Sequence, residues 1–180
     1  MVERNMIGEM QRLGLDLAEQ VLARITDNTE ALETIEGLLD EKILGIGRTV
    51  VANRDQLSNE YLTRLAKDMG VDAIHWYSPD CMVTFSAYEI DLGWVAPSTN
   101  PVRYFSTSGL MEWTEEIRQA EGNDNFYKYG YVRGTLGEFV QVGILANAVQ
   151  ALTEKFSYDV LVNDLATYGK VVYAAVINKQ

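Results

Sequence analysis

The chain has 180 residues, of which 47% are hydrophobic and 23% charged, a composition that excludes a disordered or fibrous protein and predicts one principal core. A chain of this length buries about 70% of its unfolded surface, so it needs neither a disulfide nor a metal in order to fold. Its 26 acidic and 15 basic residues give a formal net charge of −11, which argues against binding to nucleic acid because the basic residues are scattered.

Cysteine and histidine are each present once, as Cys81 and His75. A single cysteine excludes an internal disulfide, and a single histidine excludes His-rich metal sites and most multi-His catalytic schemes. No apolar stretch reaches the roughly 18 residues that a membrane span needs, and no signal peptide is visible. Taken alone, these features indicate a cytoplasmic protein. A segment lying between two membrane spans of a longer receptor has the same features, and the ending at residues 176–180, which adds no polar tail after an apolar strand, keeps that interpretation open.

The first part of the chain, residues 3–43, has the apolar spacing of a long helix. Apolar residues recur there at intervals of three, four and seven: Met6, Met10, Leu13, Leu17, Val21, Ile25, Leu32, Ile35 and Leu39. A helix of this length spans about 60 Å, whereas a compact chain of this size has a diameter of about 40 Å. A break near Asp27, where Glu30 completes a capping box, is the alternative. We predict a continuous helix because the apolar stripe resumes in register.

The rest of the chain alternates short helices with strands. Ser58 is a suitable N-cap for a helix over residues 59–69, which Gly70 ends. A short helix is expected within residues 103–110, after an irregular stretch over residues 88–100. Further helices are predicted at residues 146–156 and 158–166. Strands are predicted at residues 71–77, 82–87, 111–118, 125–133 and 138–145, with a last apolar strand at residues 171–177.

This order of elements predicts an α+β fold, in which a long N-terminal helix packs on a five-stranded antiparallel PAS-like sheet. The crossover between the second and third strands, residues 88–110, is where a PAS-like fold keeps its ligand.

Three runs of sequence resemble the Cache family, the extracytoplasmic PAS-like sensor domains of prokaryotic membrane receptors. They are residues 65–74, which enter an aromatic strand, and residues 126–132 and 139–144, which are similar to the last hairpin of that domain. The resemblance implies a signalling helix at 1–57, a sensor module at 58–166 and the start of a second, truncated module at 167–180. One residue departs from the family pattern: Cys81 stands where the first turn usually has glycine, so this turn must avoid a positive φ or carry strain.

The resemblance implies a ligand-sensing domain on the outer side of the cytoplasmic membrane, within a membrane-anchored histidine kinase, chemoreceptor or diguanylate cyclase. The region itself is then a sensor and not an enzyme, and no cofactor or metal is expected. The long apolar stripe also suggests a homodimer through the N-terminal helix, although the domain's own sheet can equally cover it.

Glu115 is a candidate site residue because strand alternation places it on the same face as Trp113 and Ile117, opposite Arg118. Two interpretations are open. Glu115 is an edge-strand carboxylate that reaches water, or it is a pocket acid that pairs with a cationic or hydroxyl group of a ligand.

Aromatic residues are dense in the same region, where Tyr127, Tyr129 and Tyr131 alternate along one strand face. They form either a packed cross-strand ladder or the wall of a small pocket. The pocket interpretation predicts as ligand an amino acid, an organic acid or an amine, with no catalytic residue. Its candidate ligand-binding residues are Trp94, Arg103, Trp113, Glu115, Tyr129 and Tyr131.

Two other functions compete with the receptor sensor. The first is a stand-alone cytoplasmic regulatory domain of the PAS or GAF type. The second is a small acid–base enzyme using His75 and Glu115, which ranks last because no second catalytic partner can be named. A dinucleotide-binding loop at residues 45–47 is not supported, because the glycine pair lacks a preceding strand and a third glycine.

Overall fold

The structure, a computed structural model, describes residues 2–156, with the side chains of residues 2–11, 13 and 17 left out. The helix predicted at 158–166, the strand predicted at 171–177 and the module predicted at 167–180 lie outside the described residues. The chain divides into two compact units, and residues 36–147 form the unit that contains the sheet.

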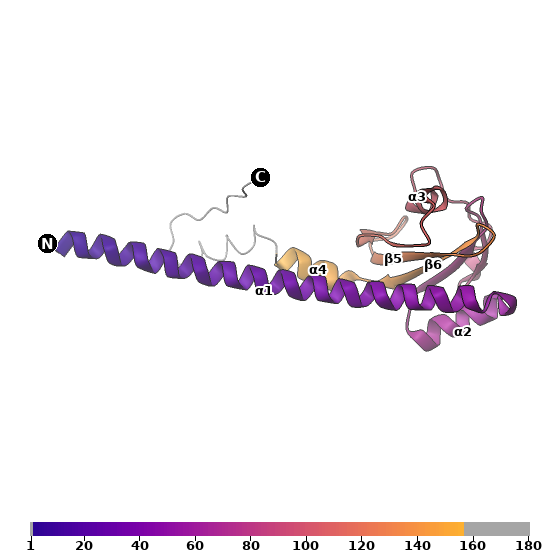
Figure 1. Ribbon diagram of the computed structural model, residues 1–180, viewed down its shortest axis with the longest axis horizontal. Coiled ribbons are helices and arrows are strands. Elements are labelled where there is room, and N and C mark those ends of the chain that lie inside the picture. The colour runs from indigo at the N-terminus through magenta and orange to yellow at the C-terminus, as the bar shows by residue number, and fades with distance from the viewer. Residues whose placement is uncertain (1, 157–180) are drawn as a thin grey trace. The chain divides into compact units, whose positions relative to one another are not determined.

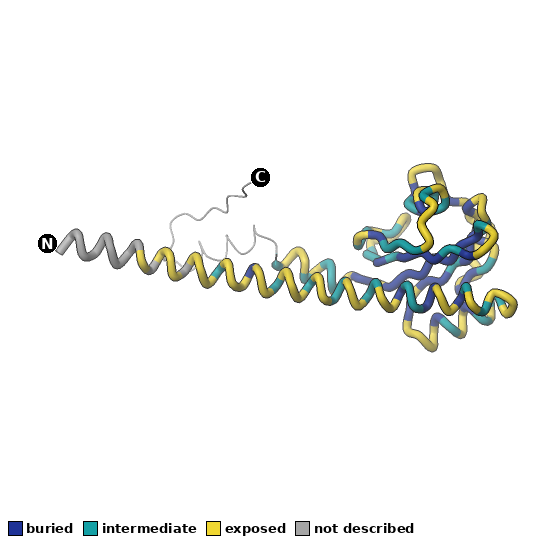
Figure 2. The backbone as a smooth tube through the Cα atoms, viewed as in Figure 1, coloured by how far each residue is buried: buried dark blue, intermediate teal, exposed yellow. Residues whose placement is uncertain are grey.

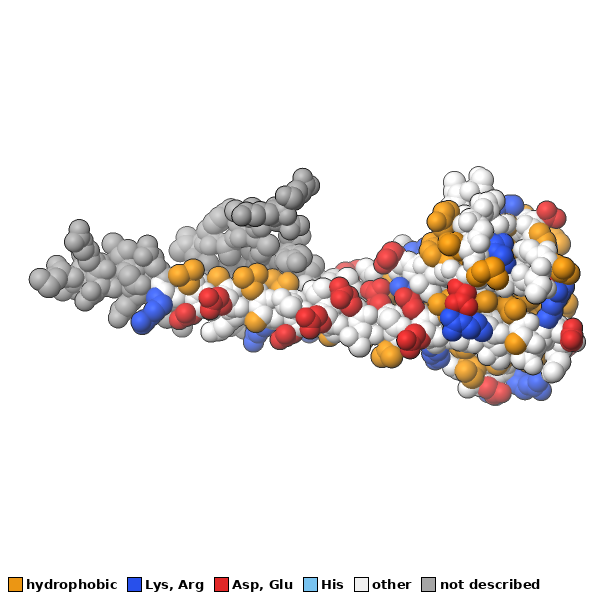
Figure 3. Space-filling view, viewed as in Figure 1, with side chains coloured by type: hydrophobic (Ala, Val, Ile, Leu, Met, Phe, Trp, Pro, Cys, Tyr) orange, Lys and Arg blue, Asp and Glu red, His pale blue; other side chains and the backbone are white. Residues whose placement is uncertain are grey.

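The long N-terminal helix is continuous, as predicted: α1 spans Val2–Ala52 with no break at Asp27. Acidic side chains recur along its described part (Figure 3). Its predicted end at residue 43 is wrong, because the helix runs through Gly45 and Gly47. Gly47 does not end the helix but lies against the sheet, where a Cβ atom would come within 2.5 Å of Val132 Cγ2.

A short 3₁₀ helix, η1 (Arg54–Gln56), leads into α2 (Asn59–Met69). The predicted caps of α2 are both confirmed. The Ser58 side chain accepts a hydrogen bond from the Tyr61 backbone N–H at 3.1 Å, and Gly70 takes the left-handed conformation with φ 59°.

The sheet is antiparallel, in the order β2-β1-β6-β5-β3, with β4 also paired to β5. The strands are β1 (Ala73–Tyr77), β2 (Val83–Ser86), β3 (Glu112–Thr114), β4 (Arg118–Gln119), β5 (Phe126–Arg133) and β6 (Phe139–Leu145). The crossover from β2 to β3 carries η2 (Glu89–Asp91) and α3 (Pro101–Ser108), and α4 (Asn147–Lys155) follows β6. The predicted α+β, PAS-like fold with its long N-terminal helix is therefore confirmed.

The sheet of the described residues has six strands where five were predicted, because the single strand expected at 111–118 is two strands. Thr114 pairs with Gly130, and Arg118 pairs with Tyr127. From Thr114 to Arg118 the chain thus advances four residues while its partner β5 advances three, which is the signature of a β-bulge. The extra residue moves Arg118 onto the sheet face that also carries Tyr127.

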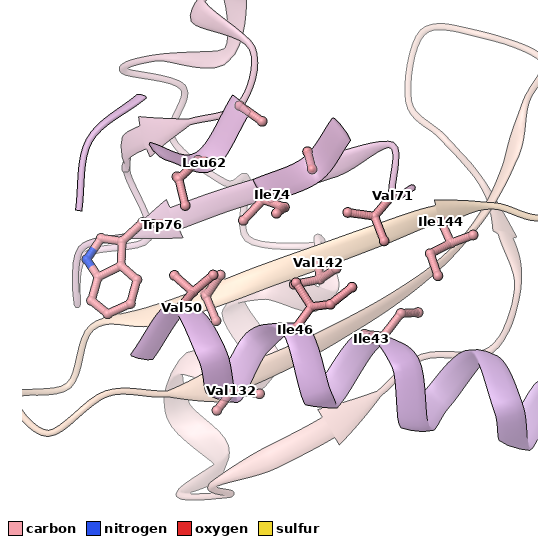
Figure 4. Close-up of a cluster of buried hydrophobic side chains, with 13 residues drawn as sticks. Ile43, Ile46, Val50, Leu62, Val71, Ile74, Trp76, Val132, Val142 and Ile144 are labelled. Atoms are coloured by element: carbon pink, nitrogen blue, oxygen red, sulfur yellow. The ribbon is translucent and has the colours of Figure 1, made fainter. Parts of the chain in front are cut away.

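The two faces of the sheet carry separate cores. α1 and α2 cover one face, and α3 lies over the other (Figure 1). The first core joins side chains of α1, including Ile43, Ile46 and Val50, to strand residues such as Ile74 and Val142 (Figure 4). The second core lies on the α3 face and contains Tyr77, Cys81, Val83, Ala96, Val102, Phe105, Tyr131 and Phe139. The central strands are accordingly buried from both sides (Figure 2).

Two glycines let α1 approach the sheet closely. A Cβ atom on Gly47 would overlap Val132, and a Cβ atom on Gly130 would overlap the Ile43 side chain. Each glycine therefore leaves the space that a side chain of the opposite element fills. This reciprocal fit brings the helix backbone and β5 together without a side chain between them.

Ion pairs also join α1 to the sheet. Lys128 on β5 is buried, and its Nζ lies 3.2 Å from Glu36 Oε2 and 3.3 Å from Asp40 Oδ1. Arg48 forms a two-point contact with Glu112 of β3. Because a buried lysine is costly unless it is paired, the two carboxylates fix which part of α1 lies over β5.

Candidate functional site

A cavity of about 530 Å³ lies between the sheet and the crossover, on the face away from α1. Its sheet side comes from β1, β2, β5 and β6, and its other walls come from the crossover and the β4 region. The lining residues are Asp72, Ala73, Tyr77, Val83, Tyr88, Ile90, Asp91, Trp94, Asn100, Val102, Arg118, Ala120, Glu121, Asn123, Tyr127, Tyr129 and Gln141.

Tyr129 is placed in this cavity by a glycine on the neighbouring strand. Gly143 pairs with Tyr129, and a Cβ atom at Gly143 would come within 2.8 Å of the tyrosine ring. The ring therefore lies over the glycine. Tyr127 stacks on Tyr129 with a centroid distance of 5.6 Å, so the two rings form a continuous aromatic surface.

Arg118 is the cationic side chain that lines the cavity. Its Nε donates a hydrogen bond to Glu115 Oε2, and its guanidinium lies 4.5 Å from the centroid of the Tyr129 ring. The terminal nitrogens of Arg118 make no hydrogen bond to the part of the chain that the structure describes. Glu115 therefore holds the Arg118 side chain in one orientation, while its terminal nitrogens stay available to a ligand.

A hydrogen-bonded network continues from Arg118 into the second core. The Tyr131 hydroxyl donates to the other carboxylate oxygen of Glu115 and accepts from Gln141 Nε2 at 2.9 Å. The Tyr77 hydroxyl in turn donates to Gln141 Oε1 at 3.2 Å. The buried polar groups are thus paired with one another, as burial requires.

Burial keeps the tyrosine hydroxyls of this site protonated. It raises the pKa of Tyr129 to about 12 against the opposing charge of Arg118, and it also raises the pKa of Tyr77. Burial, reinforced by the charge of Glu115, raises the pKa of Tyr131 well above its usual value. Burial acts to lower the pKa of Arg118, but the hydrogen bond and charge of Glu115 outweigh it, so this pKa is raised.

The crossover wall is fixed to the rest of the unit by Asn100. Its side-chain oxygen accepts from the Val102 backbone N–H at 3.0 Å and so caps α3, while its Nδ2 donates to Glu121 at 3.0 Å. Trp94 meets Tyr77 edge-on at a centroid distance of 6.5 Å. The Asp91 carboxylate lies 3.9 Å from His75 Nε2 and accepts no hydrogen bond from the described residues.

Two of the six predicted site residues, Trp94 and Tyr129, line this cavity. Arg103 does not: its Nε donates to Ala96 O at 2.7 Å and its Nη1 to Asp80 O at 3.0 Å, so it ties the crossover to the β1–β2 turn. Trp113 stacks on Tyr131 at 5.4 Å and lines, with Arg103, a separate depression beside α3. The cationic side chain in the lining of this cavity is Arg118, and Arg103 lies outside the lining.

Glu115 and Tyr131 lie beneath the cavity instead of in its lining. Glu115 is only 4% exposed, so the interpretation of an edge carboxylate that reaches water is wrong. The partners of Glu115 are Arg118 and Tyr131, both of them groups of the protein itself. Glu115 therefore holds Arg118 in position, and it does not itself line the cavity.

Alternation alone does not reveal Arg118, because a regular strand puts it opposite Glu115. The visible signal is the i,i+3 spacing of an acid and a base, and only the bulge brings this pair onto one face. Asp91 and Gln141 carry no distinguishing signal, since they come from an irregular turn and a buried strand.

The structure gives His75 and Glu115 no shared partner. His75 Nδ1 lies 3.0 Å from Ser86 Oγ, whereas Glu115 is bonded to Arg118 and Tyr131. Among residues 2–156, no three His, Cys, Asp or Glu side chains group as a metal site requires. None of the described helices is both long and apolar enough to cross a lipid bilayer.

No family model and no curated protein matches the chain. A solved structure of the E. coli DcuS sensor domain is similar, with 12% identity and a TM-score of 0.46. The match covers 64% of this chain and 95% of that one.

Proposed function

We propose that this chain is a ligand-sensing domain of the Cache type, in which a small molecule binds between the sheet and the crossover. The observation that carries the proposal is the cavity of about 530 Å³, a size typical of small-molecule sites, with aromatic walls and a few fixed polar groups. The sequence resemblance over residues 65–74, 126–132 and 139–144 supports the same function.

The domain belongs, in this proposal, to the extracytoplasmic part of a membrane-anchored signal transducer of the histidine kinase, chemoreceptor or diguanylate cyclase type. Ligand binding shifts α1 against the sheet, since β5 contacts the cavity with Tyr129 and contacts α1 with Lys128. A tenfold bias between two states needs a ligand that binds them with free energies about 1.4 kcal/mol apart. The full reading frame tests the location: membrane spans flanking this region support it, and a frame without them contradicts it.

A thermal-shift screen with amino acids, organic acids and amines tests the sensor proposal. A ligand present at one hundred times its dissociation constant adds about 2.7 kcal/mol to the free energy of unfolding. We expect Trp94→Ala to reduce the shift, and Tyr104→Ala to leave it unchanged, because Tyr104 is exposed outside this cavity. A shift that Trp94→Ala does not affect would contradict the proposed site, and a screen without any shift would contradict the function.

We also propose that a second copy of the chain pairs with the N-terminal helix. Leu15 and Leu22 lie seven residues apart on α1 and are 66% and 57% exposed. Replacing both with glutamate is expected to lower the mass measured by light scattering to that of a monomer, whereas Gln20→Glu adds charge at an exposed polar position on the opposite side of the same helix and is the control. An unchanged mass for the double variant, or a monomeric native chain, would contradict pairing.

A further inference from the structure

We infer that the ligand of this cavity is a small organic cation, an ammonium compound, and that anions such as dicarboxylates are excluded. This inference rests on the sensor function proposed above and specifies the charge of the molecule sensed. It starts from the charges that line the cavity: three carboxylates, those of Asp72, Asp91 and Glu121, and the single guanidinium of Arg118.

Arg118 does not offer an uncompensated positive charge. Its Nε is bonded to Glu115, which is buried directly behind it, so the pair is close to neutral. Counting Glu115, the cavity and its immediate support hold four carboxylates and one guanidinium. Burial lowers the pKa of His75, which removes the other nearby group able to become positive. The net charge around the cavity is therefore negative, and it repels an incoming carboxylate.

Asp91 is the carboxylate best placed to receive a cation. Glu121 and Asp72 each accept a hydrogen bond within the domain, from Asn100 Nδ2 and from the Leu145 backbone N–H. The Asp91 carboxylate accepts none from the described residues, and its nearest cationic candidate is the largely buried His75, 3.9 Å away. A ligand ammonium group can thus pair with Asp91 without displacing an existing contact.

The aromatic walls also favour a positively charged ligand. Tyr77, Tyr88, Tyr127, Tyr129 and Trp94 all line the cavity, and the faces of such rings attract cations. The structure already contains one instance, because the Arg118 guanidinium lies 4.5 Å above the Tyr129 ring. Carboxylate and aromatic faces together suit an ammonium group with a short hydrocarbon body. The free nitrogens of Arg118 can then donate to a hydroxyl at the other end.

The experiment compares probes that differ in charge, using thermal shift on the full chain at low ionic strength. The ammonium probes are choline, ethanolamine and putrescine, and the anionic probes are acetate, succinate and citrate. The neutral isostere of choline, 3,3-dimethyl-1-butanol, separates charge from shape. We expect at least one ammonium probe to raise the melting temperature, and neither the anions nor the neutral alcohol to do so.

Asp91→Asn is the critical variant, and it is expected to weaken binding of that ammonium probe about tenfold, with a smaller effect of added salt than in the native chain. Glu89→Gln is the matched control, because it removes the same charge from the same short helix η2 at a residue that does not line the cavity. The hydrogen bonds of Asp91 are made by its backbone, which the replacement keeps, and its carboxylate accepts none from the described residues, so the replacement spares the fold.

The failures of the two proposals can be told apart. If only anions raise the melting temperature, or if anions and ammonium probes do so equally, the cation inference is wrong while the sensor function stands. If Asp91→Asn binds the ammonium probe as tightly as the native chain, the assignment to Asp91 is wrong. If no probe and no compound of the wider screen has any effect, both the inference and the sensor function are contradicted.

Discussion

Cys81 is a buried residue whose backbone is strained. It has φ 64°, and among the described residues other than glycine no other has a positive φ. The residue lies in the second core and is 1% exposed. The sequence required this turn either to avoid a positive φ or to carry strain, and the structure shows the strained alternative.

We expect Cys81→Gly to be more stable than Cys81→Ala by about 1 kcal/mol, the usual cost of a left-handed conformation for a residue with a Cβ atom. Both variants lose the buried sulfur, so the comparison isolates the backbone. Urea unfolding of the two variants measures the difference. An alanine variant as stable as the glycine variant would show that the turn has relaxed and carries no strain.

His75 makes the stability of the domain depend on pH. Burial lowers its pKa in the folded state below the ordinary value of 6.5, although Asp91 partly opposes the effect. As the pH falls below 6.5, the unfolded chain binds a proton that the folded chain does not, so the free energy of unfolding decreases until the folded pKa is reached. We expect His75→Gln to flatten the dependence between pH 7 and about 5.5, where carboxylates contribute little. Urea unfolding across this range is the measurement, and an equal slope in both chains would contradict the assignment.

At the scale of elements, the packing of α1 on β5 depends on Gly47. A methyl group there would lie 2.5 Å from Val132 Cγ2, so Gly47→Ala must push the helix away or force Val132 to move. The expected cost is about 1–3 kcal/mol, typical of overpacking in a core.

Gly45 provides the matched control, because it lies in the same helix, two residues earlier, and a Cβ atom added to it would have no neighbouring atom within 4 Å. Gly45→Ala should therefore stabilise the chain by about 1 kcal/mol through helix propensity. Thermal or urea unfolding of the two variants decides the point. Two shifts of the same sign would mean that the helix does not approach the sheet as the structure shows.

For the whole molecule, local signals predicted the fold well, and long-range pairing explains where they failed. Ser58 and Gly70 specify α2 because a cap acts on its own helix. The end of α1 was misplaced because Gly47 serves a contact with Val132, far along the chain. The bulge between Thr114 and Arg118 was missed for the same reason, since it depends on pairing with β5. Four of the six predicted site residues lie outside the cavity lining.

Residues 36–147 contain both cores and the whole cavity lining, so they should fold without the start of α1. We expect a chain that begins at residue 31 to unfold in one cooperative transition, with a urea midpoint close to that of the full chain. Tryptophan fluorescence follows the transition, because Trp76, Trp94 and Trp113 all lie in this unit. A non-cooperative transition would show that residues 1–30 are part of the folding unit.

The reciprocal fit of Ile43 into the space at Gly130, and of Val132 into the space at Gly47, limits how α1 can move. Sliding the helix along its axis by less than one turn, about 5.4 Å, drives Val132 into the helix backbone, and turning it about its axis has the same effect. Rocking about this contact leaves both side chains in place. The contact therefore permits this part of α1 to tilt over β5 and prevents it from changing its register along β5.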